Sequence, residues 1–250
     1  MNGTQEGAEA TTARASNEAI AALTAWDTPT ICNGLELVDQ ATRLAHYTTR
    51  TMVLAPDRIE LRDGARAVCG RAKTVRLEGT SPHGRSYDEN SALKADYYEY
   101  IADADGPVIV VVEDIDEHPL GAFWGEVHSA LHHKLGAAGV VTNGVIRDLD
   151  DLDPRMPILG GSVAPSHAYV RWVDFGRGAS VFGMSVSDGD VVHMDRHGAV
   201  RVPEHAVERL PEAIAEIQRR EARVLDIARA EGPIDLARLR ATVAGPSAKR

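Results

Sequence analysis

The chain has 250 residues, of which 44% are hydrophobic and 26% charged, and this suits one globular domain with a large core. Its formal net charge of −10 disfavours nucleic-acid binding, and no apolar run approaches the roughly 20 residues that cross a bilayer. The two cysteines, Cys32 and Cys69, provide neither a disulfide framework nor a CxxC metal motif, and the N-terminus lacks an apolar signal region. We therefore expect a cytoplasmic protein.

Helices are predicted near the N-terminus. Residues 1–16 are small and polar, and we expect a disordered tail there. Apolar residues from Ile20 to Trp26 then recur at helical spacing. Pro29 suits the first turn of a second short helix, which contains residues 31–38.

Strands are predicted in the middle of the chain. Residues 66–79 alternate in part between apolar and polar side chains. Residues 106–116 form a continuous apolar run, which is typical of a strand covered on both faces. Residues 157–166 are predicted to form a further strand and loop.

A βαβ unit is predicted over residues 107–146. Residues 125–139 have the apolar spacing of a helix that ends at Gly136 or Gly139, and residues 140–146 are expected to form the next strand. A strand, helix and strand in this order imply parallel strands with a right-handed crossover.

Short β segments and a long helix are predicted in the last third. From residue 172 the apolar segments are brief and separated by turn signals at 187–189 and 196–198. Residues 204–231 form a strongly amphipathic helix, in which Pro211 marks a bend or a restart.

These predictions divide the chain into three regions. Residues 1–16 are the N-terminal tail, residues 17–232 are a single domain that includes the long helix, and residues 233–250 are a C-terminal tail. No internal repeat is present.

Arg147 and Asp148 directly follow the predicted strand 140–146. Functional residues of α/β proteins concentrate beyond the carboxyl ends of parallel strands. The preceding strand ends near Asp114, and its loop leads to Glu126, so we expect two loops to converge on one cleft. An arginine fork and free helix amides bind an oxyanion, while two carboxylates suit Mg²⁺. The pattern predicts a pocket for a 2-oxo acid, although an isolated Arg-Asp pair is more often a surface ion pair or a helix cap.

The spacing of these residues resembles the RraA-like family. That family includes class II 4-hydroxy-4-methyl-2-oxoglutarate (HMG) and 4-carboxy-4-hydroxy-2-oxoadipate (CHA) aldolases, and regulators of RNase E. The resemblance extends over about residues 20–215. It is carried by Gly125-Glu126, Gly139-Val140-Val141, Gly144 and Arg147-Asp148, and by the flanking stretches 23–36, 69–76 and 187–203.

The resemblance implies a fold, an assembly and a reaction. The fold is an α/β/β/α sandwich related to swivelling phosphohistidine domains, assembled as a homotrimer or as a hexamer with sites between subunits. The reaction is a retro-aldol cleavage that releases pyruvate from a 4-hydroxy-2-oxo acid and depends on a divalent cation, Mg²⁺ or Mn²⁺, as Lewis acid. Decarboxylation of oxaloacetate is an expected side activity.

The resemblance also implies roles for individual residues. Arg147 binds the substrate carboxylate or enolate, and Asp148 holds the metal largely through water. Glu126 steadies the metal-bound water. The loop whose amides bind the 2-oxo acid consists of Gly125, Glu126, Val127 and His128.

This chain departs from the family pattern at several positions. Asn33 stands where many members have Asp. Class II aldolases receive an acidic residue from the neighbouring subunit, but the corresponding stretch, 195–198, carries Arg196 and His197. Residues 78–100 differ from the short loop of typical aldolases, and we expect them to build a different wall for substrate specificity.

Two alternatives compete with this interpretation. A non-catalytic protein that binds and inhibits an RNase is possible within the family, but regulators tend to lose the acid after the arginine, whereas Asp148 is retained here. A zinc site is suggested by the i, i+4 spacing of His128 and His132, but no HExxH motif accompanies it. We expect His132 and His133 to be surface or interface residues.

Overall fold

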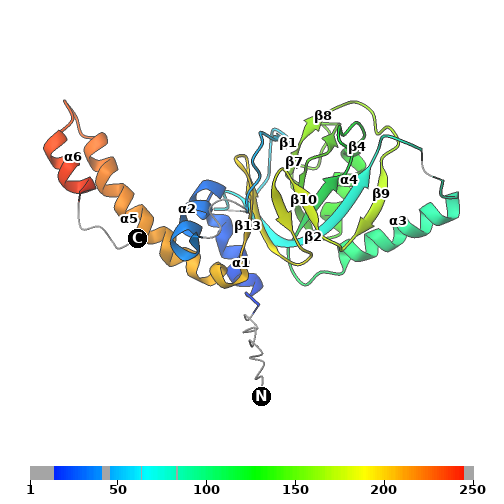
Figure 1. Ribbon diagram of the computed structural model, residues 1–250, viewed down its shortest axis with the longest axis horizontal. Helices are drawn as coiled ribbons and strands as arrows, with labels where there is room; N and C mark the ends of the chain where they lie inside the picture. The colour runs from blue at the N-terminus through cyan, green and yellow to red at the C-terminus, as the bar shows by residue number, and fades with distance from the viewer. Residues whose placement is uncertain (1–13, 41–45, 63, 83, 245–250) are drawn as a thin grey trace, which may run out of the picture.

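The computed structural model describes residues 14–40, 46–62, 64–82 and 84–244 (Figure 1). An eight-stranded sheet forms its centre, in the order β1-β7-β5-β3-β2-β12-β13, with β9 pairing with β2. The strands are β1 (Val53–Ala55), β2 (Val68–Glu78), β3 (Val108–Asp114), β5 (Ala137–Thr142), β7 (Ile158–Gly160), β9 (Arg171–Phe175), β12 (Val191–Asp195) and β13 (Gly198–Val202). The predicted α/β class is confirmed.

The predicted βαβ unit is also confirmed. Helix α4 (Glu126–Lys134) connects β3 to β5, and these two strands pair in parallel. The helix ends where Gly136, with φ 98°, adopts a left-handed conformation that favours glycine. Strand β2 lies on the other side of β3, also in parallel, so β3 is central in the sheet.

Strand β3 is covered on both faces, as its continuous apolar sequence predicts. Val110 and Val112 belong to a core that contains Tyr97 of α3 (Tyr87–Ala102) and Trp124. Val111 faces the opposite core, which the hairpin of β10 (Ala179–Val181) and β11 (Met184–Val186) covers. The period-two alternation of a strand thus divides its side chains between two apolar layers.

The prediction of one continuous strand over 140–146 is wrong. Strand β5 ends at Thr142, and Val145–Ile146 forms β6 in a separate three-stranded sheet with β4 (Ala122–Trp124) and β8 (Ser162–Val163). The side chain of Asn143 causes the break because its Oδ1 accepts from Asp114 N at 2.8 Å and its Nδ2 donates to Asp114 O at 2.7 Å. An amide side chain therefore replaces strand pairing at the end of β3.

The strand predicted within 157–166 divides in the same way. Strand β7 belongs to the main sheet and β8 to the small sheet, with Gly161 between them. A Cβ on Gly161 would lie less than 3.0 Å from the carbonyl oxygen of Asn143. The close approach of the two backbones therefore requires glycine at this position.

The remaining helices gather at the β13 side of the sheet (Figure 1). The N-terminal helices are α1 (Asn17–Ala22), η1 (Leu23–Ala25) and α2 (Thr28–Val38), and the C-terminal ones are η3 (Glu204–Arg209), α5 (Leu210–Ala228) and α6 (Leu236–Val243). The predicted restart is confirmed, because Pro211 occupies the first turn of α5. None of the helices within the described residues is long and apolar enough to cross a bilayer.

The two predicted tails fall partly outside the described residues, which exclude 1–13 and 245–250. At the N-terminal end, Ser16 caps α1 by accepting from Ala19 N at 3.1 Å. At the C-terminal end, α6 lies within the region 233–250.

Candidate functional site

The parallel pairing of β4 with β6 places Arg147 and Asp148. Trp124 pairs with Ile146, and the next backbone amide, Arg147 N, donates to Trp124 O at 2.9 Å. The two strands therefore end together, and Gly125 and Arg147 both begin loops at the same edge of the small sheet. Their convergence, which the sequence predicts, is present in the structure.

A left-handed backbone conformation turns Asp148 back toward Gly125. The φ of Asp148 is 53°, a value that non-glycine residues rarely adopt but that Asp and Asn tolerate best. Its carbonyl oxygen accepts from Asp151 N at 2.9 Å, which closes a tight turn. This turn directs the Asp148 carboxylate at the first residues of α4.

Gly125 leaves no room for a side chain. A Cβ there would lie less than 3.0 Å from Asp148 Oδ2 and 3.3 Å from Nε of Arg147. Across this gap, Glu126 N donates to Asp148 Oδ2 at 3.3 Å, and Arg147 Nε lies 3.5 Å from the same oxygen. The structure thus brings a guanidinium, a carboxylate and the N-terminus of a helix together.

The cluster is open to solvent on one side. The side chains of Arg147 and Asp148 are 37% and 34% exposed, and Glu126 and Val127 are exposed as well. The first amides of a helix have no intrahelical acceptor. Because Glu126 N is directed at Asp148, the amides of Val127 and His128 are the ones available to an incoming oxyanion.

His128 and His132 lie on the inner face of α4. Their rings stack with centroids 5.5 Å apart, and the His128 ring centroid lies 4.2 Å from that of Phe123. Burial lowers the pKa of His128 to about 3, with smaller contributions from the charges of His132, Lys94 and Arg147. His128 is therefore a neutral imidazole beside the cluster.

The expectation that His132 is a surface or interface residue is wrong. His132 is fully buried, and its Nδ1 lies 2.7 Å from His128 O. A carbonyl only accepts, so Nδ1 carries the proton, and Nε2 accepts from the Tyr97 hydroxyl at 2.6 Å. Burial lowers the pKa of His132 to about 4. Both ring nitrogens are engaged within the protein, which excludes His132 from the zinc pair that its spacing suggests.

Residues 78–100, expected to form a wall for specificity, contain most of α3. The helix begins with a capping box in which Ser86 and Glu89 satisfy each other's backbone amides. Its Tyr97 is fully buried and contacts His132, while Lys94 lies over the ring of Tyr98 at 5.7 Å. Helix α3 therefore supports α4 from behind the cluster.

Asp114, which sequence reasoning did not single out, is buried at the end of β3. Burial raises its pKa to about 6, and the charges of Asp116 and Glu78 act in the same direction. A Cβ on Gly144 would lie 3.3 Å from Asp114 Cβ, so this carboxyl is near the turn that leads to Arg147. Its position directly after the apolar run of a parallel strand could have identified Asp114 from the sequence as a candidate site residue.

The donor set at Asp148 suits a hard cation. Within the described ranges, no group of three or more His, Cys, Asp or Glu side chains converges as a metal site. Zinc commonly takes three or four such ligands, whereas Mg²⁺ is often held by one or two carboxylates and retains several waters. A partly exposed Asp148 with Glu126 nearby fits the second pattern.

Within one subunit, the stretch 195–198 is distant in space from the cluster at Arg147 and Asp148. Asp195 ends β12, which runs antiparallel to β2, so it lies near the beginning of β2 and not at its end. Its carboxylate accepts from Thr28 N at 2.9 Å and from His197 N at 2.7 Å. Asp195 therefore holds the entry to α2 and the adjacent turn.

Comparisons with known proteins were made for both sequence and structure. A family model described as RraA-like, aldolase/RraA, matches residues 28–201. No curated protein matches the chain.

Several solved structures share the fold. Streptomyces coelicolor RraAS2, described as an unusual member of the RNase ES inhibitor RraA protein family, is 20% identical, with 84% of this chain and 96% of that chain covered and a TM-score of 0.62. An uncharacterized protein from Pseudomonas syringae pv. tomato str. DC3000 is 15% identical, with coverage of 90% and 99% and a TM-score of 0.64. A protein described among novel cellulases from microbes associated with the gut ecosystem is 15% identical, with coverage of 83% and 87% and a TM-score of 0.65. Identities this low show the fold alone, whereas the family model matches most of the sequence. The chain therefore belongs to the RraA-like family, which includes both aldolases and RNase inhibitors.

Proposed function

We propose that this protein is a divalent-metal-dependent lyase that cleaves a 4-hydroxy-2-oxo acid by a retro-aldol reaction and releases pyruvate. The supporting observation is the contact of Arg147 and Asp148 with Gly125 and the amide of Glu126. A guanidinium, a carboxylate and helix amides in one open cluster complement the carboxylate and keto oxygens of a 2-oxo acid.

Arg147 and the loop 125–128 bind the substrate in this proposal. The Arg147 guanidinium pairs with the substrate carboxylate, because its planar fork matches two oxygens. The free amides of Val127 and His128 donate to the keto acid from the N-terminus of α4. Gly125 keeps these groups close together, since any side chain there would separate Asp148 from α4.

Asp148 would hold Mg²⁺ or Mn²⁺, and the Glu126 carboxylate would steady the surrounding water. The bound cation supplies Lewis-acid polarisation of the 2-oxo group. Asp148 contributes the negative charge that retains a cation, and its left-handed turn fixes the direction of that charge.

The reaction breaks the C3–C4 bond of the substrate and yields a carbonyl compound and pyruvate. A solvent-derived base near Asp148 removes the proton of the 4-hydroxyl, and C4 becomes a carbonyl as the C3–C4 bond breaks. The electron pair of that bond moves into the enolate of pyruvate, which takes up a proton at C3. The positive charge of Arg147 stabilises the negative charge that develops on the enolate oxygen. The same stabilisation would support decarboxylation of oxaloacetate.

The test is pyruvate release from a panel of 4-hydroxy-2-oxo acids and oxaloacetate, with and without Mg²⁺ or Mn²⁺. We expect cation-dependent turnover that Asp148→Asn abolishes. Asp150→Asn is the matched control, because Asp150 is an exposed carboxylate in the same loop. Arg147→Lys should lower kcat/KM by roughly 10²–10³-fold, the cost of losing one well-placed donor to a developing oxyanion.

Full turnover in both Asp148→Asn and Arg147→Lys would remove these residues from the mechanism. Absence of turnover on every substrate would favour the alternative, a non-catalytic RraA-type protein that binds and inhibits an RNase. That alternative is then tested by adding the protein to an RNase E-type enzyme and measuring cleavage.

Proteins of this family commonly self-associate. We propose a homotrimer or hexamer here. Sedimentation velocity distinguishes these assemblies from a monomer.

A further inference from the structure

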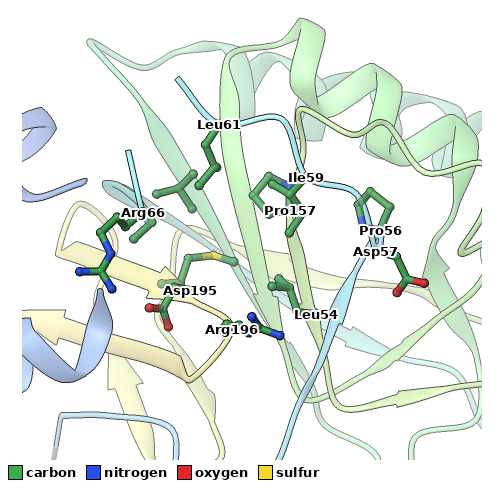
Figure 2. A pocket seen from close by; sticks show the side chains of 12 residues that line it. Leu54, Pro56, Asp57, Ile59, Leu61, Arg66, Pro157, Asp195 and Arg196 are labelled. Atoms are coloured by element: carbon green, nitrogen blue, oxygen red, sulfur yellow. The ribbon is translucent and has the colours of Figure 1, made fainter. Parts of the chain in front are cut away.

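A second concave region lies at the end of the main sheet where β2 and β7 begin (Figure 2). The cavity has a volume of about 550 Å³ and is bordered by the end of β1, the loop that follows it, the start of β2 and the end of β12. Ligand pockets for small molecules typically measure about 300–1,000 Å³. The cavity is therefore large enough for a small organic molecule.

Apolar residues are the majority of those that line the cavity. Leu54, Ile59, Leu61, Val68, Pro157 and Met194 line the cavity. The first four are only half-buried, although they belong to a concave surface. Apolar groups that face a hollow and remain partly accessible to water are typical of a ligand site, because a bound apolar group would cover them.

Four charged residues, Asp57, Arg66, Asp195 and Arg196, border the cavity, and two of them are already engaged. Arg66 Nη2 lies 2.6 Å from Asp27 Oδ2, and Asp195 accepts from the backbone of α2 and of the following turn. Arg196 is exposed, and it forms no ion pair with any of the residues that the structure describes. Figure 2 shows its guanidinium directed toward Leu54, at the apolar wall.

We propose that this cavity is a binding site for a small amphipathic carboxylate, with its apolar body against Leu54, Ile59 and Leu61 and its carboxylate on Arg196. One guanidinium beside an apolar wall matches a ligand with one anionic group and one apolar group. Medium-chain alkyl carboxylates and aryl carboxylates both have these two groups.

This site is separate from the cluster at Arg147. Val68 is the first residue of β2, whereas Gly144, from which β6 leads to Arg147, lies next to Asp114 at the end of the parallel strand β3. Strand β2 alone spans roughly 33 Å at about 3.3 Å per residue. A ligand of eight to ten carbon atoms cannot occupy both places, so the proposal does not depend on the proposed lyase activity.

The test is isothermal titration calorimetry of the full-length protein with octanoate, 3-phenylpropionate and octanamide. Octanamide retains the apolar body of octanoate but lacks its charge. We expect one octanoate per chain, bound at least tenfold more tightly than octanamide. Relative binding of octanoate and 3-phenylpropionate shows whether the wall prefers an alkyl or an aryl body.

Arg196→Gln should lower octanoate affinity by roughly tenfold to a hundredfold, as expected for loss of a hydrogen bond to a charged group, and leave octanamide binding unchanged. Arg58→Gln is the matched control, because Arg58 lies in the loop that follows β1, has a side chain that is 88% exposed, and does not line the cavity. Arg147→Ala should also leave octanoate binding unchanged.

Three results would each overturn the proposal. The first is no saturable binding of either carboxylate at millimolar concentration, which would indicate that another copy of the chain fills the cavity. The second is equal affinity for octanoate and octanamide. The third is loss of octanoate binding in Arg147→Ala, which would place the ligand in the candidate functional site.

Discussion

Replacement of Gly125 by alanine tests the geometry on which the proposed function depends. The new Cβ would lie less than 3.0 Å from Asp148 Oδ2, whereas ordinary van der Waals contact begins at 3.4 Å. Because the turn at Asp148 is partly exposed, we expect the carboxylate to move away by about 0.5–1 Å instead of the fold being disrupted. The variant therefore separates a local displacement from unfolding.

The expected magnitudes differ strongly between activity and stability. A misplacement of about 1 Å in a catalytic group costs on the order of 10²-fold in rate. Gly125 is also the N-cap of α4, where replacement of a good capping residue by alanine costs about 1 kcal/mol. In a chain of this length, that loss lowers Tm by only about 2–4 °C.

The assays are pyruvate release under saturating Mg²⁺, Mn²⁺ affinity by calorimetry, and thermal unfolding followed by circular dichroism. Gly84→Ala is the matched control, because a Cβ on Gly84 meets nothing within 4 Å. Gly125→Ala should lose turnover and cation affinity together, while Gly84→Ala keeps both. If Gly125→Ala retains the turnover and the Mn²⁺ affinity of the parent protein, the contact between Gly125 and Asp148 has no functional role.

Three further predictions concern the buried groups behind the site. Tyr97→Phe removes the hydroxyl that donates to His132 Nε2 at 2.6 Å, so we expect a loss of about 1–3 kcal/mol in urea unfolding, and an unchanged midpoint would contradict the hydrogen bond. The pKa of His132 is lowered by burial to about 4, so below pH 6.5 the unfolded chain takes up the proton first. The contribution of His132 to the free energy of unfolding should then fall by up to about 3 kcal/mol between pH 6.5 and 4, and His132→Gln should remove this contribution from the profile. The pKa of Asp114 is raised by burial to about 6, so its ionisation destabilises the folded state as pH rises from about 4 to 6. Asp114→Asn should therefore stabilise the protein at pH 7 by up to about 3 kcal/mol and have no such effect at pH 4; an equal effect at both pH values would exclude titration as the cause.

Much of the fold follows from local patterns. The apolar run at 106–116 and the helical spacing at 125–139 predict β3 and α4, because burial on two faces and on one stripe leaves different periodicities. Pro29 similarly predicts the start of α2, where the Asp27 side chain accepts from Thr30 N at 3.1 Å. Each of these signals acts within a few residues of its own position.

The break after Thr142 could not be predicted in this way. Residues 140–146 are a plausible single strand, and only the hydrogen bonds from the Asn143 side chain to Asp114 end it. The burial of His132 has a similar origin. Its partner Tyr97 comes from α3, 35 residues earlier in the chain, and no local pattern specifies which face of α4 that helix covers.

The sequence by itself determined the order and type of most elements, and the presence of an arginine, an aspartate and a glycine-led helix at the ends of two successive strands. Periodicity and turn-forming residues are properties of neighbouring positions, so they can be recognised from the sequence without knowledge of the fold. The tertiary structure alone decided that Asp148 turns back onto Gly125, that His132 is fully buried and His128 half-buried with both rings neutral, and that Arg196 faces an apolar hollow where β2 begins. Each of these depends on contacts between residues far apart in the chain, whose distances are settled only when the sheets and helices pack together.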